Sequence, residues 1–243
     1  MPNTLEPSAW AERHFPGYWE QVAQALAAAG LAAHERALDA KNGSHLETNE
    51  AYGATFWLAL PQEVSARLVT IPGASLIPPG AGCRYPLIAF GDSLLFPARF
   101  GNGSQGVDHL VLHPSGLRTE ILAIRDWSDA AVQVPLDLGP EFERDNEPSR
   151  IQELLLGVAR TILVAYECEA RSGLLHVYLG EASFDAETGQ VTWLYREELP
   201  LATLRGLQSL AVLADEDVTF DNAPEPTVDL QLRDDDAAAN GKE

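Results

Sequence analysis

Ser93 carries a hydroxyl group, which could do chemistry if a base lay beside it. It follows the apolar residues 87–90 and the pair Gly91 and Asp92, residue types that are favoured in tight turns. A serine hydroxyl attacks an acyl carbon when a base within hydrogen-bond reach takes its proton. The bases that we consider are His109 and His113, which the fold would have to bring to Ser93.

Residues 90–94 have the sequence Phe-Gly-Asp-Ser-Leu, which resembles the first sequence block of the GDSL (SGNH) hydrolases. In that family a serine at the end of the first strand is the nucleophile, so the resemblance implies an acyl hydrolase that uses Ser93. The family's Asp-x-x-His block and its Gly-x-Asn-Asp block are absent from this sequence. In the other interpretation, Gly91, Asp92 and Ser93 form a hairpin turn between two strands. We adopt the turn, so no catalytic residue is expected.

The spacing of His109 and His113 is that of two zinc ligands on one face of a helix. Residues 107–113, however, alternate like a strand and meet Pro114. On a strand the two histidines would lie about 13 Å apart, too far to share one metal ion. The same strand leaves no room for the helix that a dinucleotide site would need after the Gly-x-Gly-x-x-Gly spacing of residues 101–106. We therefore expect no metal and no cofactor.

The chain has 36 acidic and 16 basic residues and a formal net charge of −20. Residues 1–214 alone carry 26 acidic and 14 basic residues, so the acidity is not confined to the C-terminal end. Nucleic acids and anionic membrane surfaces would be repelled by this field. We therefore expect neither direct nucleic-acid binding nor membrane binding, and the field favours a basic protein as partner.

Two parts of the sequence are candidates for contact with such a partner. Residues 137–147 are an acidic connector, and the strands expected at 174–184 and 190–198 carry aromatic side chains. Carboxylates would pair with basic side chains, and aromatic rings would supply apolar contact. The candidate binding residues are Glu141, Glu143, Asp145, Tyr178, Trp193 and Tyr195.

Hydrophobic periodicity predicts both helices and strands along the chain. Apolar residues at helical spacing predict a helix at 18–29, which Gly30 could end, and a second helical piece at 31–40, which either continues the first helix or packs beside it. Residues 149–171 are apolar around most of a helical circumference and predict one long buried helix, and a further helix is expected at 200–213. The expected strands are residues 54–60, 64–71, 85–90, 94–100, 107–113, 117–124, 174–184 and 190–198.

These elements predict an α+β fold with a mainly antiparallel sheet built from hairpins. An N-terminal helical segment precedes the sheet, and the long helix at 149–171 precedes a C-terminal hairpin. We expect one globular domain over residues 1–214, with a candidate subdivision near 137–148. Residues 215–243 are strongly acidic and are expected to form a disordered tail.

Cysteine usage and hydropathy indicate the compartment. Cys83 and Cys168 are too few for a disulfide framework, the first residues lack a signal-peptide pattern, and the longest apolar stretch is too short to span a bilayer. We therefore expect a cytoplasmic location. The sequence predicts a non-enzymatic cytoplasmic binding or assembly protein, the acidic member of a multi-protein system, with a hydrolase that uses Ser93 as the alternative.

Overall fold

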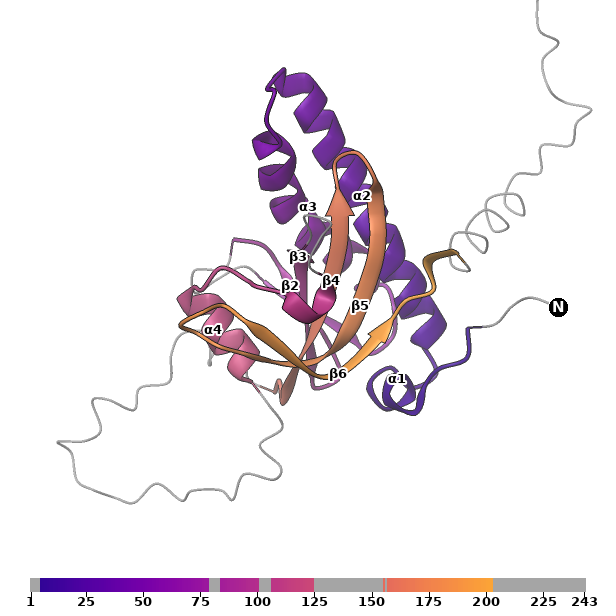
Figure 1. Ribbon diagram of the computed structural model, residues 1–243. Coiled ribbons are helices and arrows are strands. Elements are labelled where there is room, and N and C mark those ends of the chain that lie inside the picture. The colour runs from indigo at the N-terminus through magenta and orange to yellow at the C-terminus, as the bar shows by residue number, and fades with distance from the viewer. Residues whose placement is uncertain (1–4, 79–83, 101–105, 125–154, 156, 203–243) are drawn as a thin grey trace, which may run out of the picture. The chain divides into compact units, whose positions relative to one another are not determined.

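One six-stranded sheet organises the fold (Figure 1). The computed structural model describes residues 5–78, 84–100, 106–124, 155 and 157–202. The strands are β1 (Ala74–Ile77), β2 (Leu87–Phe90), β3 (Ser93–Phe100), β4 (Arg160–Glu169), β5 (Gly173–Phe184) and β6 (Val191–Glu198). The helices are α1 (Ala9–His14), α2 (Trp19–Ser44), α3 (Glu50–Leu68), the short 3-10 helix η1 (Val107–His109) and α4 (Gly116–Ala123).

The strands lie in the sheet in their chain order, from β1 to β6. Neighbouring strands are antiparallel except β3 and β4, which run parallel with Ser93 opposite Arg160 and Phe100 opposite Glu167. The predicted α+β class with a mainly antiparallel sheet is confirmed. Parallel neighbours need a long crossover connection, and residues 101–159, which include η1 and α4, provide it here.

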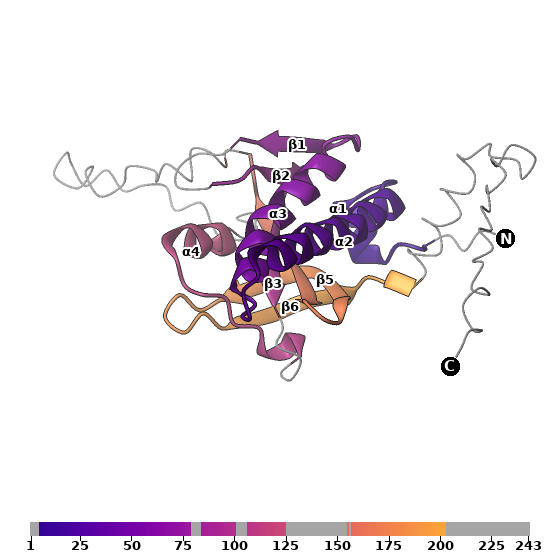
Figure 2. The ribbon, with the colours of Figure 1, turned by 90° about the horizontal axis from the view of Figure 1, so that it is seen from above.

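Helices pack on both faces of the sheet. The buried side chains of α1, α2 and α3 join Leu95, Val164 and Leu179 in one core cluster. Figure 1 shows α2 behind β4 and β5, and the view from above in Figure 2 shows it running along one side of the sheet. The opposite face carries α4 and the segment after η1, which pack against Phe96 and Leu163 in a second cluster.

α2 is one continuous helix over Trp19–Ser44, so residues 31–40 continue the first helix past Gly30 and do not form a second helix beside it. Gly30 lies in the middle of the helix against the ring of Tyr166 in β4. A Cβ atom at this position would be 2.8 Å from two carbons of that ring. The glycine therefore marks a close approach of helix and sheet, not the end of a helix.

α3 replaces the two strands predicted at 54–60 and 64–71, which are wrong. Aromatic and β-branched residues favour strands, and Pro61 suggested that a strand stopped there. The buried residues recur with a helical period instead, and burial of one side of the helix outweighs the strand preference of the individual residues. Its members, four residues apart, are Tyr52, Phe56, Leu60, Val64 and Leu68.

The long helix predicted at 149–171 is wrong, because residues 160–169 form β4. Residues 161–166 are all buried, since β4 lies in the middle of the sheet with core clusters on both faces. A strand buried on both faces is a continuous apolar run, which has no alternation to separate it from a buried helix. Residues 149–154 of the predicted helix lie outside the described residues.

The hairpin predicted at 107–113 and 117–124 is also wrong. Residues 107–109 form η1, and Val111 makes an isolated bridge to Gln190. Gly116–Ala123 form α4, for which Ser115 is the N-cap: its hydroxyl accepts a hydrogen bond from the Arg118 N–H at 3.3 Å. This cap favours the helix at a position where the alternation favoured a strand.

The strands predicted at 85–90, 94–100, 174–184 and 190–198 are confirmed as β2, β3, β5 and β6. The tight turn predicted between β2 and β3 is also present, with Gly91 at φ = 59°. The acidic connector, the subdivision near 137–148 and the tail at 215–243 lie outside the described residues and stay predictions. The same holds for the helix at 200–213 beyond residue 202.

Candidate functional site

A bulge in the β5–β6 pair places Trp193 and Tyr195 on opposite faces of the sheet. Glu181 lies opposite Tyr195, but Ala182 lies opposite Trp193, so Leu194 is an extra residue in β6. Leu194 is correspondingly 61% exposed. As a result Trp193 packs on the side of the sheet that carries α4, whereas Tyr195 faces α1.

Gly180 permits this bulge. A Cβ atom at this position would lie 1.9 Å from the carbonyl oxygen of Tyr195, well inside any non-bonded contact distance. A glycine inside a strand is typical of such a close backbone approach. The close approach of β5 and β6 at Tyr195 therefore depends on the missing side chain of Gly180.

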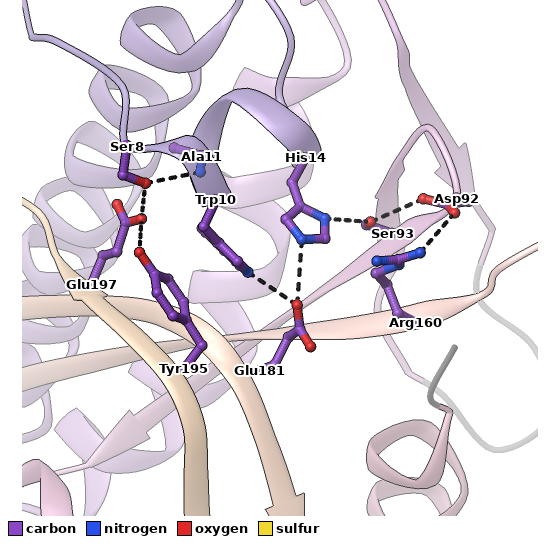
Figure 3. A network of polar contacts seen from close by, with 10 residues as sticks. All are labelled: Ser8, Trp10, Ala11, His14, Asp92, Ser93, Arg160, Glu181, Tyr195 and Glu197. Atoms are coloured by element: carbon purple, nitrogen blue, oxygen red, sulfur yellow. Dashed lines mark hydrogen bonds and ion pairs between the residues drawn. The ribbon is translucent and has the colours of Figure 1, made fainter. Parts of the chain in front are cut away.

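α1 is fixed to this hairpin by polar and aromatic contacts (Figure 3). The Trp10 Nε1–H donates to Glu181 Oε1 at 3.0 Å, and the Trp10 ring stacks on Tyr195 with centroids 5.1 Å apart. Ser8, the N-cap of α1, donates its hydroxyl proton to the Glu197 carboxylate. A helix of six residues is unstable alone in water, so α1 depends on these contacts.

His14, the last residue of α1, lies against Ser93, the first residue of β3. Its Nδ1 is 3.2 Å from Ser93 Oγ, and its Nε2 is 3.4 Å from Glu181 Oε1. Asp92 lies on the other side of Ser93, with Oδ1 3.1 Å from Ser93 Oγ and Oδ2 3.5 Å from the Arg160 guanidinium. A serine, an imidazole and a carboxylate therefore lie in series (Figure 3), the residue types of a nucleophilic triad.

Sequence reasoning missed His14, which precedes Ser93 by 79 residues and belongs to no motif. The sequence signal that could have indicated a buried His14 lies in residues 8–14 themselves. Ser8 is a good N-cap, and Trp10, Ala11 and His14 then lie on one side of a short helix, all three buried. A buried histidine needs a polar partner, but the sequence does not say which strand supplies it.

The Ser93 hydroxyl has one proton and two neighbours that can accept it. If the hydroxyl donates to Asp92, then His14 Nδ1 must carry a proton and donate it to Ser93 Oγ. If it donates to His14, the neutral ring keeps its proton on Nε2, which faces Glu181. In that second arrangement serine, histidine and carboxylate follow one another as in a catalytic triad. The ring nitrogens differ, because here Nδ1 faces the serine and Nε2 faces the carboxylate. Among the described residues, no acceptor is aligned for a hydrogen bond with Nε2, so Glu181 acts on it mainly through charge.

Burial lowers the pKa of His14 below its ordinary value near 6.5. The Glu181 carboxylate opposes this shift, Arg160 and Arg13 add to it, and Asp92 opposes it more weakly. The imidazole is therefore neutral near pH 7.

We expect acid to destabilise the chain through His14. Because its pKa is lowered in the fold, the unfolded chain takes up a proton first as the pH falls below about 6.5. This part of the stability is complete above that pH and is lost below it. Thermal unfolding at about pH 7.5 and about pH 5.5 should therefore show a smaller drop in Tm for H14Q than for the unchanged chain.

H34Q is the companion variant for this measurement, because burial also lowers the pKa of His34. Each single variant should lose part of the acid sensitivity, and the double variant should lose more than either. An H14Q variant whose Tm falls as much as that of the unchanged chain would contradict the assignment to His14.

The helix that covers Ser93 also carries its histidine. Ser93 is 1% exposed and His14 is 5% exposed, and Trp10 lies over the imidazole with ring centroids 4.6 Å apart. A movement of α1 that opened Ser93 to a substrate would take His14 away from it. In the described arrangement, Ser93 and the histidine beside it are both closed to solvent.

The histidines considered from the sequence lie elsewhere. His109 is an exposed residue of η1, and His113 is exposed, with its Nδ1 2.8 Å from the Pro114 carbonyl oxygen. The Ser93 hydroxyl contacts His14 and Asp92 instead. The structure therefore offers Ser93 a base, but not one of the two that the sequence suggested.

The candidate binding residues do not form one surface. Tyr178 and Trp193 pack on the side of the sheet that carries α4, and the bulge places Tyr195 on the other side, against Trp10. The acidic candidates Glu141, Glu143 and Asp145 lie outside the described residues.

A second buried polar cluster joins α2, α3 and β4. The Tyr52 hydroxyl is 2.9 Å from His34 Nδ1 and 3.1 Å from Cys168 Sγ, and the Arg99 Nε–H donates to the Cys168 carbonyl at 3.0 Å. Burial raises the pKa of the Cys168 thiol and lowers the pKa of His34, so both groups are neutral near pH 7. A protonated and fully buried thiol is unreactive, so this cluster holds the core together.

In the part of the chain that the structure describes, no group of three or more His, Cys, Asp and Glu side chains is placed to hold a metal ion. No described helix is both long enough and apolar enough to cross a membrane. No family model, curated protein or solved structure matches this chain.

Proposed function

We propose that this chain is a non-enzymatic cytoplasmic binding or assembly protein, the acidic member of a multi-protein system, and that it binds a basic protein. The observation that carries the proposal is that α1 both covers Ser93 and supplies its histidine. Nucleophile and base therefore meet only in a closed arrangement, which favours a structural role for Ser93 over a catalytic one.

Charge supports the choice of partner. The formal net charge is −20, and several of the described basic side chains are engaged by carboxylates of the chain itself. Arg36 and Arg67 both pair with Glu63, and Arg196 pairs with Asp108. A strongly negative surface speeds association with a positively charged protein and makes the complex sensitive to salt.

Affinity purification from the source organism should recover a basic protein in stoichiometric amount at low ionic strength. Raising the salt from about 50 mM to about 500 mM should release this protein, because the attraction is screened. The triple variant E141Q/E143Q/D145N tests the acidic connector, and E35Q/E47Q/E187Q is its control with the same change in charge. Recovery of no stoichiometric partner would contradict the proposal, and equal binding by both variants would exclude the connector as the contact.

A serine hydrolase is the second candidate function, favoured by the series Ser93, His14 and Glu181. In this hypothesis Ser93 Oγ attacks the acyl carbon of an ester and passes its proton to His14 Nδ1. The imidazolium returns that proton to the alcohol that leaves as the ester C–O bond breaks, and water then hydrolyses the acyl-serine. The Glu181 carboxylate stabilises the imidazolium that forms. The substrate would have to reach Ser93 without displacing α1.

A fluorophosphonate probe separates the two functions. On the proposed binding function, the folded chain is not labelled, and W10A, which removes the ring over His14, is not labelled either. Labelling of the unchanged chain that disappears in S93A, with both proteins folded by circular dichroism, would establish the hydrolase and overturn the non-enzymatic proposal.

A further inference from the structure

Two aromatic rings lie at one end of the sheet face that carries α4. Phe100 at the end of β3 and Tyr178 in β5 are half-buried, with ring centroids 6.0 Å apart. α4 covers the other end of this face, at the start of β4, where the Thr161 hydroxyl donates to the Ile121 carbonyl at 2.7 Å. The two rings therefore lie beyond the helix.

Two carboxylates lie beside these rings. Glu198 Oε1 is 2.6 Å from His176 Nδ1, and Glu167 Oε2 is 4.0 Å from His176 Nε2. The strand register explains the grouping, because Glu167 lies opposite His176 and Glu198 lies opposite Tyr178. His176 also stacks on Tyr178, with centroids 5.9 Å apart. We call Phe100, Glu167, His176, Tyr178 and Glu198 the Tyr178 face.

Exposure and charge make this face suitable for a cation. The side chains of Glu198 and His176 are 50% and 46% exposed, and the side chain of Glu167 is 15% exposed. Burial raises the pKa of Tyr178, and the carboxylates of Glu198 and Glu167 raise it further, while Arg196 opposes them. The carboxylates therefore make the potential at the ring negative, which attracts a positive group.

An arginine of the chain itself shows how a guanidinium lies on this face. Arg196 is 5.4 Å from the centroid of the Tyr178 ring and forms an ion pair with Asp108 of η1 at 2.6 Å. An aromatic face with a carboxylate at the edge of the guanidinium is a geometry in which arginine binds well. Phe100 and Glu167 provide the same two elements on the adjoining part of the sheet.

We infer that the Tyr178 face docks an arginine-bearing segment of a basic partner protein. The inference rests on the proposed function and adds to it where the partner binds and which side chain it presents. The partner's guanidinium group packs against the half-buried rings of Phe100 and Tyr178, beside the Arg196 and His176 side chains that already lie on Tyr178, and Glu167 and Glu198 pair with its N–H groups. Lysine binds more weakly here, because an ammonium group does not stack and presents no planar fork.

The test uses the full chain and two labelled peptides, nona-arginine and nona-lysine, with binding followed by fluorescence polarisation. E167Q/E198Q should lower the affinity for nona-arginine about tenfold, because two charged contacts are lost. E35Q/E47Q changes the net charge equally at exposed positions away from the face and should lower the affinity less than about twofold. The Tm of each variant establishes that it is folded.

The ring is tested separately. Y178L should remove most of the preference for nona-arginine over nona-lysine, whereas Y178F, which keeps an aromatic face, should retain it. Equal losses in E167Q/E198Q and E35Q/E47Q would mean that bulk charge alone binds the peptide, and would overturn the inference. An unchanged preference in a folded Y178L would overturn it as well.

The two proposals fail in different ways. If a stoichiometric basic partner is recovered from the organism but the two charge variants bind nona-arginine equally, the Tyr178 face is wrong and the binding function stands. If no partner is recovered, the binding function is wrong whatever the peptides do.

Discussion

Gly180→Ala should lower the free energy of unfolding by about 3 kcal/mol, at the upper end of the range for overpacking by a single group. The added Cβ would lie 1.9 Å from the Tyr195 carbonyl oxygen, and a backbone atom cannot move aside as a flexible side chain can. β5 and β6 must separate locally or lose the bulge. For a domain of this size the loss corresponds to a Tm lower by roughly 6–12 °C, measured by differential scanning calorimetry.

Gly116→Ala is the control for this substitution. Gly116 also lacks a positive φ angle, but nothing lies within 4 Å of the Cβ that would be added, so its Tm should stay close to that of the unchanged chain. Hydrogen exchange should show that Gly180→Ala loosens α1 together with β6, because Glu181 and Tyr195, which both contact Trp10 of α1, lie opposite each other beside the bulge. A Gly180→Ala protein as stable as the control would show that the described register of the hairpin is wrong.

Gly30→Ala should destabilise the chain although it improves helix propensity. In an open helical position this substitution gains up to about 1 kcal/mol of stability. Here the new methyl group would lie 2.8 Å from two carbons of the buried Tyr166 ring, whose hydroxyl donates to the Leu26 carbonyl at 3.1 Å. Overpacking of this kind costs about 1–3 kcal/mol, so we expect a net loss measured as a lower Tm.

Two further variants test the cause of that loss. Gly43→Ala changes a glycine of the same helix with nothing within 4 Å of the new Cβ, and should raise the Tm slightly. In a Tyr166→Leu background, Gly30→Ala should become neutral or stabilising, because the ring that it strikes is gone. A double-mutant cycle that gives no coupling between Gly30 and Tyr166 would contradict this explanation.

The hairpins could be predicted from sequence because their signals are local. Gly91 marks the turn between β2 and β3, and residues 185–189 mark the turn between β5 and β6. β4 could not be predicted in the same way, because burial on both faces removes the alternation that identifies a strand. Its identity depends on β3 and β5, which lie beside it in space.

The candidate site was predicted only in part. Ser93 was singled out, but its partner His14 and the Glu181 carboxylate beside His14 come from distant parts of the chain and are brought together by the docking of α1. The bulge was hidden as well: the alternation of Trp193 and Tyr195 places both on one side of a regular strand, whereas Leu194 shifts them to opposite sides. Gly180 was the available sign of an irregularity, since glycine inside a strand is typical of a bulge.

The parallel pair of β3 and β4 has a consequence for how the chain folds. β1, β2 and β3 form one three-stranded meander, β4, β5 and β6 form another, and each is built from neighbours in sequence. The two halves of the sheet are joined through β3 and β4, whose pairing requires closure of residues 101–159. Local pairings carry a small entropy cost and form fast, whereas closing a long connection is slow. We therefore expect the two meanders to form first and their union to limit the folding rate, so that substitutions along β3 and β4 slow folding more than those in the outer hairpins.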